Sequence, residues 1–192
     1  MVFGINIFEV IGFVFALAGV WLAAKQNIWT WPVGLVGIIA YLIFFYQIKL
    51  YADMGLQAFY IAASIYGWYE WLHGGKNKAE LPVSRLRNSQ RILAVFTGAV
   101  FSMGLAFYFR TYTDAHYPTF DSGLAGFSLV AQFLLTRKKI ENWVVWFLVD
   151  IGYVGLYWLK GAYLTTALYS LFLLLAVRGY ILWRKELLAR TA

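Results

Sequence analysis

The chain of 192 residues lacks cysteine altogether and has only two histidines and three prolines. The absence of cysteine excludes disulfides, thiolate nucleophiles and cysteine-based zinc or iron–sulfur sites. The histidines, His73 and His116, fall far apart in predicted loops, which leaves a metal or haem site almost without support. No glycine-rich phosphate loop is present, which argues against ATP-driven chemistry. We therefore expect no metal and no other cofactor.

Charged residues are also scarce. They make up 13% of the chain and apolar residues 62%, whereas soluble domains carry about 25% charged and about 45–50% apolar residues. Aromatic residues reach 20%, which fits aromatic belts at two membrane interfaces. The first apolar run, at residues 7–24, lacks the basic start and cleavage site of a signal peptide. The composition indicates an integral membrane protein, and we expect this first run to be a retained spanning helix.

Seven apolar windows of about 18 to 22 residues are long enough to cross a bilayer as helices. Seven spans place the two termini on opposite sides of the membrane. Three basic residues fall on the side of the N-terminus and thirteen on the other side, so the positive-inside rule predicts an outside N-terminus and a cytoplasmic C-terminus. This bias also explains the net charge of +7 without a nucleic-acid partner. The pattern predicts an all-α integral membrane protein with spans near 7–24, 32–49, 53–72, 90–109, 120–136, 142–159 and 162–183.

The sequence also repeats itself. Residues 25–72 align without a gap to residues 137–184, at an offset of 112 residues that takes Trp31 to Trp143. One helix between two three-helix units makes both units enter the membrane in the same direction, a parallel 3+1+3 arrangement that transporters use. The alternative is a duplication kept only as scaffold. We predict a single transmembrane transporter domain over residues 1–192, with repeat unit 7–72, linking helix 90–109 and repeat unit 120–184.

Asp150 stands at the middle of the 142–159 span, where a charged side chain costs about 2.5–3.5 kcal/mol on insertion scales. Trp143, Trp146 and Asp150 follow at i, i+3 and i+7 on one helix face, and Tyr153 and Tyr157 extend it. Indole faces beside a carboxylate suit a flat cation, because ring stacking, cation–π attraction and charge pairing all contribute. We predict a substrate-binding site for a small cationic aromatic molecule.

Other interpretations of this stripe stay open. Trp143 and Trp146 could belong to an aromatic belt at the membrane interface. Asp150 could be hydrogen-bonded to a neighbouring helix as structural glue, or it could relay protons in a proton-coupled carrier. Asp150 aligns with Ile38 of the first repeat, and this loss of symmetry is what a site for one asymmetric molecule would produce.

A second stripe lies on the third span, where Gln57, Tyr60, Ser64 and Trp68 share one helix face. The amide of Gln57 can both donate and accept hydrogen bonds. It could bind polar groups of a ligand or bridge two helices. We include Gln57 and Tyr60 among the predicted substrate-binding residues.

These residues carry a family resemblance. The motifs LYADMGLQ and YGWYEW in the first repeat, and WVVWFLVD in the second, resemble the Pnu family of bacterial vitamin transporters from about residue 10 to 184. By position, Trp143, Trp146 and Asp150 match that family's binding motif, and Gln57 matches a glutamine on its third helix. The resemblance implies seven-helix protomers laid out like the SWEET sugar carriers and assembled as homotrimers in the bacterial inner membrane.

The resemblance also implies a function. Family members carry nicotinamide riboside, thiamine or riboflavin by facilitated diffusion, and a separate cytoplasmic kinase traps the product. Asp150 replaces the asparagine of many nicotinamide riboside carriers, which leaves thiamine as an alternative, while the LQ pair favours nicotinamide riboside. A retinal photoreceptor needs a lysine in its last helix, and residues 162–183 contain none. We expect a transporter and not an enzyme, with a proton-coupled carrier or a non-transporting scaffold as further alternatives.

Overall fold

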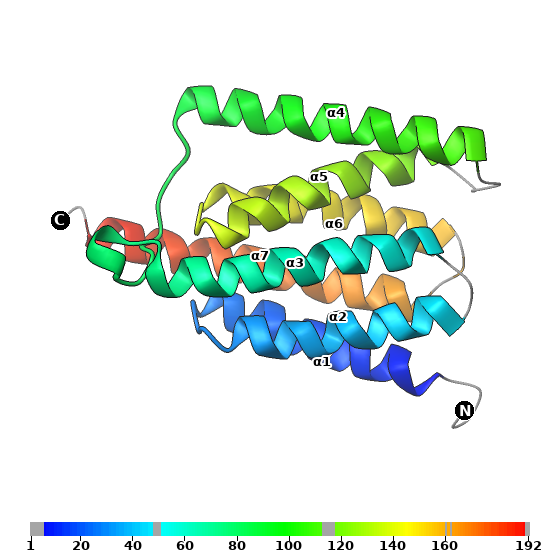
Figure 1. Ribbon diagram of the computed structural model, residues 1–192, viewed down its shortest axis with the longest axis horizontal. Helices are drawn as coiled ribbons and strands as arrows, with labels where there is room; N and C mark the ends of the chain where they lie inside the picture. Colours follow the sequence, from blue (N-terminus) through cyan, green and yellow to red (C-terminus); the bar gives the residue numbers. More distant parts are fainter. Residues whose placement is uncertain (1–5, 48–50, 113–117, 160, 162, 191–192) are drawn as a thin grey trace. The chain divides into compact units, whose positions relative to one another are not determined.

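The computed structural model of the chain describes residues 6–47, 51–112, 118–159, 161 and 163–190. Residues 48–49 of the second predicted span, residue 162 and His116 lie outside this described part. The described residues contain seven α-helices and one short 3-10 turn, and no strand (Figure 1). The helices are α1 (Ile7–Ala24), α2 (Thr30–Gln47), α3 (Tyr51–His73), α4 (Asn88–Tyr112), α5 (Pro118–Thr136), α6 (Glu141–Leu159) and α7 (Tyr163–Ala189).

The seven predicted spans are confirmed as helices. Most of their ends lie within three residues of the predicted positions, but α7 continues to Ala189, six residues beyond the prediction. The last turns of α7 are charged, and a hydropathy window therefore stops before them. An ion pair of 2.7 Å between Arg190 and Glu186, one helical turn apart, helps this polar end to stay helical.

Five of the helices among the described residues are long and apolar enough to cross a membrane by length and composition alone: α1, α2, α4, α6 and α7. The other two, α3 and α5, are 23 and 19 residues long and are not among these five. In α5 nine of the 19 residues are buried, among them Ser122 and Ser128. Polar groups are tolerated inside a membrane protein when protein and not lipid surrounds them. The chain is therefore an all-helical, multi-pass membrane protein.

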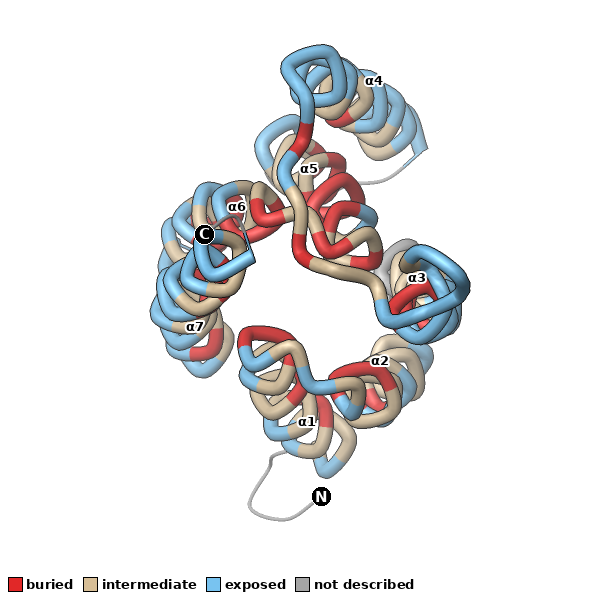
Figure 2. Tube along the Cα trace, turned by 90° about the vertical axis from the view of Figure 1, so that its left-hand side faces the viewer, coloured by how far each residue is buried: buried red, intermediate tan, exposed pale blue. Residues whose placement is uncertain are grey.

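The helices form two compact units, unit 1 (Met1–Pro82) and unit 2 (Val83–Ala192). In unit 1, α2 contacts both α1 and α3. In unit 2, α6 contacts both α5 and α7 in the same way, and α4 packs on α5. Gly98 is the one buried residue on α4, and the rest of this helix is mostly exposed (Figure 2). The two three-helix repeats thus share one order of contacts, and α4 stands outside that order.

The first turn of each repeat has the same backbone structure. Gln26, between α1 and α2, and Lys138, between α5 and α6, both adopt a positive φ, of 55° and 44°. Five backbone hydrogen bonds around Gln26 recur around Lys138 at the offset of 112 residues. They join 25 to 21, 26 to 23, 27 to 22, 30 to 27 and 31 to 28 in the first repeat, and 137 to 133, 138 to 135, 139 to 134, 142 to 139 and 143 to 140 in the second. The repeat seen in the sequence is therefore also a repeat of backbone geometry.

In each repeat a tryptophan of the second helix packs against the third helix. In unit 1 the ring of Trp31 lies over Gly67 and meets Trp71 edge to face, with ring centroids 5.2 Å apart. In unit 2 the ring of Trp143 lies over Gly179 and meets Trp183 edge to face at 5.4 Å. A glycine is required because a Cβ at Gly179 would stand 2.5 Å from the Trp143 ring. The same tryptophan–glycine contact holds α2 against α3 and α6 against α7.

Candidate binding site on α6

Asp150 lies at the centre of α6, nine residues from either end of the helix. Only 2% of its surface is exposed, and its Oδ1 has no hydrogen-bond partner among the residues that the structure describes. A buried carboxyl group without a partner costs free energy, so such a group in a native protein usually has a function. The described residues thus offer no second helix that holds this oxygen as structural glue.

Aromatic rings lie along the face of α6 that carries Asp150. Tyr153 and Tyr157 follow it along α6 and stack on each other, with centroids 5.7 Å apart. Tyr169 of α7 packs on both rings, at 4.7 Å from Tyr153 and 5.3 Å from Tyr157. Tyr153 belongs to a buried cluster with two apolar residues of α6, and the side chains packed around that cluster include Leu124, Phe127, Trp146, Tyr157 and Tyr169. The carboxyl group of Asp150 therefore shares its helix face with an aromatic cluster of low polarity.

The sequence did not predict the position of Tyr169. In the sequence, this residue stands out only as the counterpart of Gln57 in the repeat alignment. The useful signal was that an aromatic residue replaces an amide at this position, but its contact with Tyr153 depends on how α6 and α7 pack. Helical spacing identifies residues on one face of one helix and does not identify the residues of the next helix that meet them.

The two predicted tryptophans of α6 lie in different surroundings. Trp146 is half-buried and packs against the aromatic cluster around Tyr153, one turn from Asp150. Trp143 is 2% exposed, and Gly179 and Trp183 of α7 enclose it. Burial of this kind does not fit a lipid-facing belt position for Trp143. Its packing is fully accounted for by the contact that the first repeat also has, and a role for Trp143 in binding stays a prediction.

The remaining predicted residues, Gln57 and Tyr60, lie on α3 in unit 1, and both are half-buried. The ring of Tyr60 meets its neighbour Phe59 edge to face at 5.9 Å. The structure describes these two residues within unit 1, whereas in unit 2 it packs Trp146 against the cluster of Tyr153, on the helix that also carries Asp150. A binding role for Gln57 and Tyr60 stays a prediction from the sequence.

The chemistry available around Asp150 is that of binding. One carboxyl group and several aromatic faces can hold a cationic ring, because the carboxylate attracts its charge and the π-faces attract it further. The described residues contain no group of three or more His, Asp or Glu side chains that could hold a metal ion. The seven helices form two three-helix repeats joined by α4, and the carboxyl group of Asp150 lies at the centre of α6 in the second repeat. This arrangement is that of a membrane transporter.

Comparison with known proteins gives the family. Residues 6–185 match the model of a family described as nicotinamide mononucleotide transporter, and the chain belongs to that family. The predicted resemblance to the Pnu transporters is thereby confirmed, and so is the prediction that the chain is a transporter and not an enzyme.

Two curated relatives cover most of the chain. The nicotinamide riboside transporter PnuC of Escherichia coli (strain K12) is 30% identical over 200 residues, which span 91% of this chain and 84% of the relative. The riboflavin/roseoflavin transporter RibM of Streptomyces davaonensis is 28% identical over 179 residues, which span 91% and 83%. The two relatives carry different molecules, so the family alone does not identify the substrate of this chain.

A solved structure has the same fold. The crystal structure of the vitamin B3 transporter PnuC matches with a TM-score of 0.75 and 24% sequence identity, over 93% of this chain and 81% of the solved one. This likeness confirms the predicted fold class of seven transmembrane helices.

Proposed function

We propose that this protein carries nicotinamide riboside into the bacterial cell by facilitated diffusion across the inner membrane. The observation that carries the proposal is the buried carboxyl group of Asp150, whose Oδ1 has no partner among the described residues. Nicotinamide riboside has a flat, permanently positive pyridinium ring, which can serve as the partner of this oxygen. The name of the relative from Escherichia coli supports the same substrate.

Binding at this site follows from the neighbours of Asp150. The carboxylate pairs with the pyridinium charge, and the half-buried ring of Trp146 offers a face to the flat ring, beside the packed rings of Tyr153, Tyr157 and Tyr169. A cation over such a face gains about 0.5–2 kcal/mol, more when water is excluded. Lipid offers no partner for the positive charge of the ring. The carboxylate and the aromatic side chains of this helix face supply that partner inside the membrane.

A calorimetric titration of the purified protein with nicotinamide riboside, thiamine and riboflavin tests the substrate. We expect nicotinamide riboside to bind and Asp150→Asn to weaken this binding by at least about tenfold, because about 1.4 kcal/mol of charge pairing corresponds to tenfold in Kd. Glu186→Gln, which removes a carboxylate from the charged end of α7, is the control and should bind as the natural protein does. Unchanged binding in Asp150→Asn would refute the proposed role of Asp150.

Two other vitamins are alternatives with distinct outcomes. Thiamine is also a cationic ring, and it becomes the substrate if it binds more tightly than nicotinamide riboside and loses affinity in Asp150→Asn. Riboflavin is neutral, and the relative RibM favours it. A neutral ligand gains little from the carboxylate, so riboflavin binding should be almost indifferent to Asp150→Asn. Failure of all three vitamins to bind would overturn the proposal.

Facilitated diffusion is tested in liposomes that contain only this protein. Uptake should follow the substrate gradient and should not change when a pH gradient is imposed. A proton-coupled carrier would respond to the pH gradient, and Asp150→Asn would abolish that response while leaving exchange. Absence of any uptake would favour a non-transporting scaffold. We propose that a separate cytoplasmic kinase traps the vitamin by phosphorylation, which adds a charge that prevents its return.

We also propose the orientation and assembly that the sequence predicts, with the N-terminus outside, the C-terminus in the cytoplasm, one transporter domain in repeats 7–72 and 120–184, and a homotrimer. The natural chain has no cysteine, so a single cysteine introduced at Asn88 reports its side of the membrane without interference. We expect a membrane-impermeant thiol reagent to leave this cysteine unlabelled in intact cells and to label it in inverted vesicles. The mass of the purified complex tests the homotrimer.

A further inference from the structure

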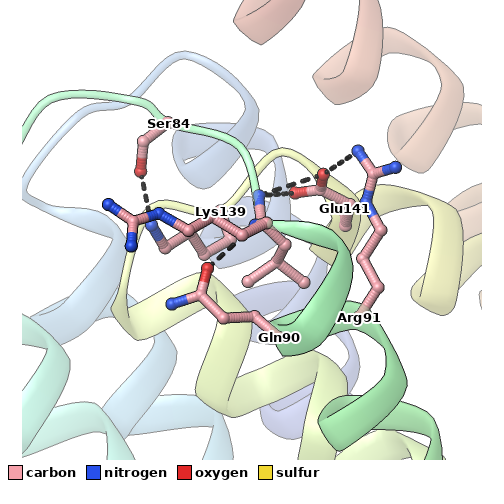
Figure 3. Close-up of polar contacts among 7 residues, drawn as sticks. Ser84, Gln90, Arg91, Lys139 and Glu141 are labelled. Atoms are coloured by element: carbon pink, nitrogen blue, oxygen red, sulfur yellow. Dashed lines mark hydrogen bonds and ion pairs between the residues drawn. The ribbon is translucent and has the colours of Figure 1, made fainter.

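Three helix ends of unit 2 meet at one boundary of the membrane. Here α5 ends at Thr136, α6 begins at Glu141 and α4 begins at Asn88. The segment before α4, residues 83–87, lies along the turn between α5 and α6 (Figure 3). The N–H of Ser84 donates to the carbonyl of Lys138, and the N–H of Ile140 donates to the carbonyl of Ser84, both at 3.0 Å.

Side chains hold this segment further. The N–H of Leu86 donates to both oxygens of the Glu141 carboxylate at 3.1 Å, and Arg91 pairs with the same carboxylate at 3.0 Å. The side chain of Leu86 is buried against Val130 and Leu134 of α5. The segment is therefore a fixed part of unit 2 and not a loose loop, so its basic side chains project from a defined backbone.

Residues 83–87 and the α5–α6 turn together form a corner that carries more positive than negative charge. Arg85 and Arg87 are exposed, and neither guanidinium has an ion pair among the described residues. Lys139 donates from its Nζ to the Ser84 hydroxyl at 2.9 Å (Figure 3). Burial lowers the pKa of Lys139, repulsion by Arg137 and Arg87 lowers it too, and attraction by Glu141 only partly opposes these effects. Burial is the largest of these effects, and the two arginines add positive charge near Lys139.

We propose that Arg85, Arg87 and Lys139 bind the phosphate of an anionic phospholipid headgroup. The side chains stand beside the ends of membrane-spanning helices, at the level where headgroups lie, and fixed basic pockets at this level attract anionic lipids. A lipid fits this position better than a soluble anion because its acyl chains continue along the exposed apolar side chains of α4, such as Ile92 and Val95. The bound headgroup would add to the contacts that keep residues 83–87 on the α5–α6 turn.

The test is thermal unfolding of the full chain in nanodiscs of phosphatidylcholine alone or mixed with phosphatidylglycerol. We expect phosphatidylglycerol to raise the Tm of the natural protein and Arg85→Gln/Arg87→Gln to lose most of that rise. The matched control is Arg184→Gln/Lys185→Gln, which removes the same charge from the polar end of α7 and should keep the rise. Equal Tm values of the three proteins in phosphatidylcholine would establish that each variant is folded.

Two results would overturn the proposal. If phosphatidylglycerol raises the Tm of all three proteins equally, or of none, the corner has no specific headgroup site. If inorganic phosphate in phosphatidylcholine nanodiscs raises the Tm of the natural protein as much as phosphatidylglycerol does, the ligand is a soluble phosphate and not a lipid. Counting phosphatidylglycerol molecules by native mass spectrometry gives an independent readout, in which Arg85→Gln/Arg87→Gln should retain fewer than the control.

Discussion

Substitution of Gly179 by alanine tests the contact between α6 and α7 directly. The added methyl group would stand 2.5 Å from the Trp143 ring, about an ångström inside ordinary contact. The ring cannot move away easily, because Trp143 is 2% exposed and Trp183, 0% exposed, meets it edge to face. The helices must therefore separate or the ring must leave its rotamer, which costs about 1–3 kcal/mol in a well-packed interior.

The magnitude has to be separated from the intrinsic preference of alanine for helices. Alanine is favoured over glycine by about 0.8–1 kcal/mol in a helix interior, so part of the cost is offset. Gly155→Ala on α6 is the matched control, because a Cβ there meets nothing within 4 Å. We expect Gly155→Ala to be neutral or stabilising and Gly179→Ala to be less stable than it by about 1–3 kcal/mol.

The assay is denaturant unfolding of the purified protein in one detergent, followed by intrinsic tryptophan fluorescence and checked by circular dichroism. A double-mutant cycle with Trp143→Ala sharpens it. Removal of the ring leaves room for the methyl group, so Gly179→Ala should cost much less in that background. Equal stability of Gly179→Ala and Gly155→Ala would refute the reasoning, and so would an unchanged cost of Gly179→Ala without the ring.

Three further predictions concern stability in the same assay. Glu141→Ala removes the carboxylate that holds Leu86 and Arg91 and should lower the free energy of unfolding by about 1–3 kcal/mol; no change would mean that the segment before α4 is held without it. Thr30→Val removes the buried hydrogen bond from α2 to a carbonyl of α1 and should cost about 1 kcal/mol, whereas an equally stable variant would contradict this. Gln26→Gly relieves a positive φ and should stabilise by up to about 1 kcal/mol, and destabilisation would contradict the left-handed turn.

The helices could be predicted from the sequence because a membrane span needs only a sufficient length of apolar residues. The repeat could be predicted because Gly67 and Gly179, and the tryptophans around them, keep their register. The contact itself could not, since helical spacing does not say whether Trp143 faces a ligand, lipid or the next helix. The structure places it against Gly179 of α7.

Little in the sequence indicates that residues 83–87, the segment before α4, contact the turn between α5 and α6. Ser84 joins the α5–α6 turn through its backbone N–H and carbonyl, and every residue except proline carries these groups. Glu141 likewise accepts from a backbone N–H, and its ion pair with Arg91 joins two residues that lie 50 positions apart, so helical spacing does not mark them as partners. The burial of Asp150 could be predicted, because an ionisable side chain in the middle of an apolar span almost always faces protein or a cavity and not lipid.

The matching turns at Gln26 and Lys138 indicate which features the two repeats kept in common. Backbone hydrogen bonds at matching positions close both turns, whereas the side chains that assist them differ: Asn27 accepts from the N–H of Trp29 in the first turn, and Asn142 donates to the carbonyl of Lys139 in the second. The turn of the second repeat has a further contact, since Lys138 and Ile140 also bind Ser84 of the segment before α4. The two repeats thus share the backbone structure of this turn and differ in its side chains. Exchange of residues 25–29 with 137–141 should consequently preserve both helix pairs and weaken the hold on residues 83–87, because it removes the side chains of Lys139 and Glu141.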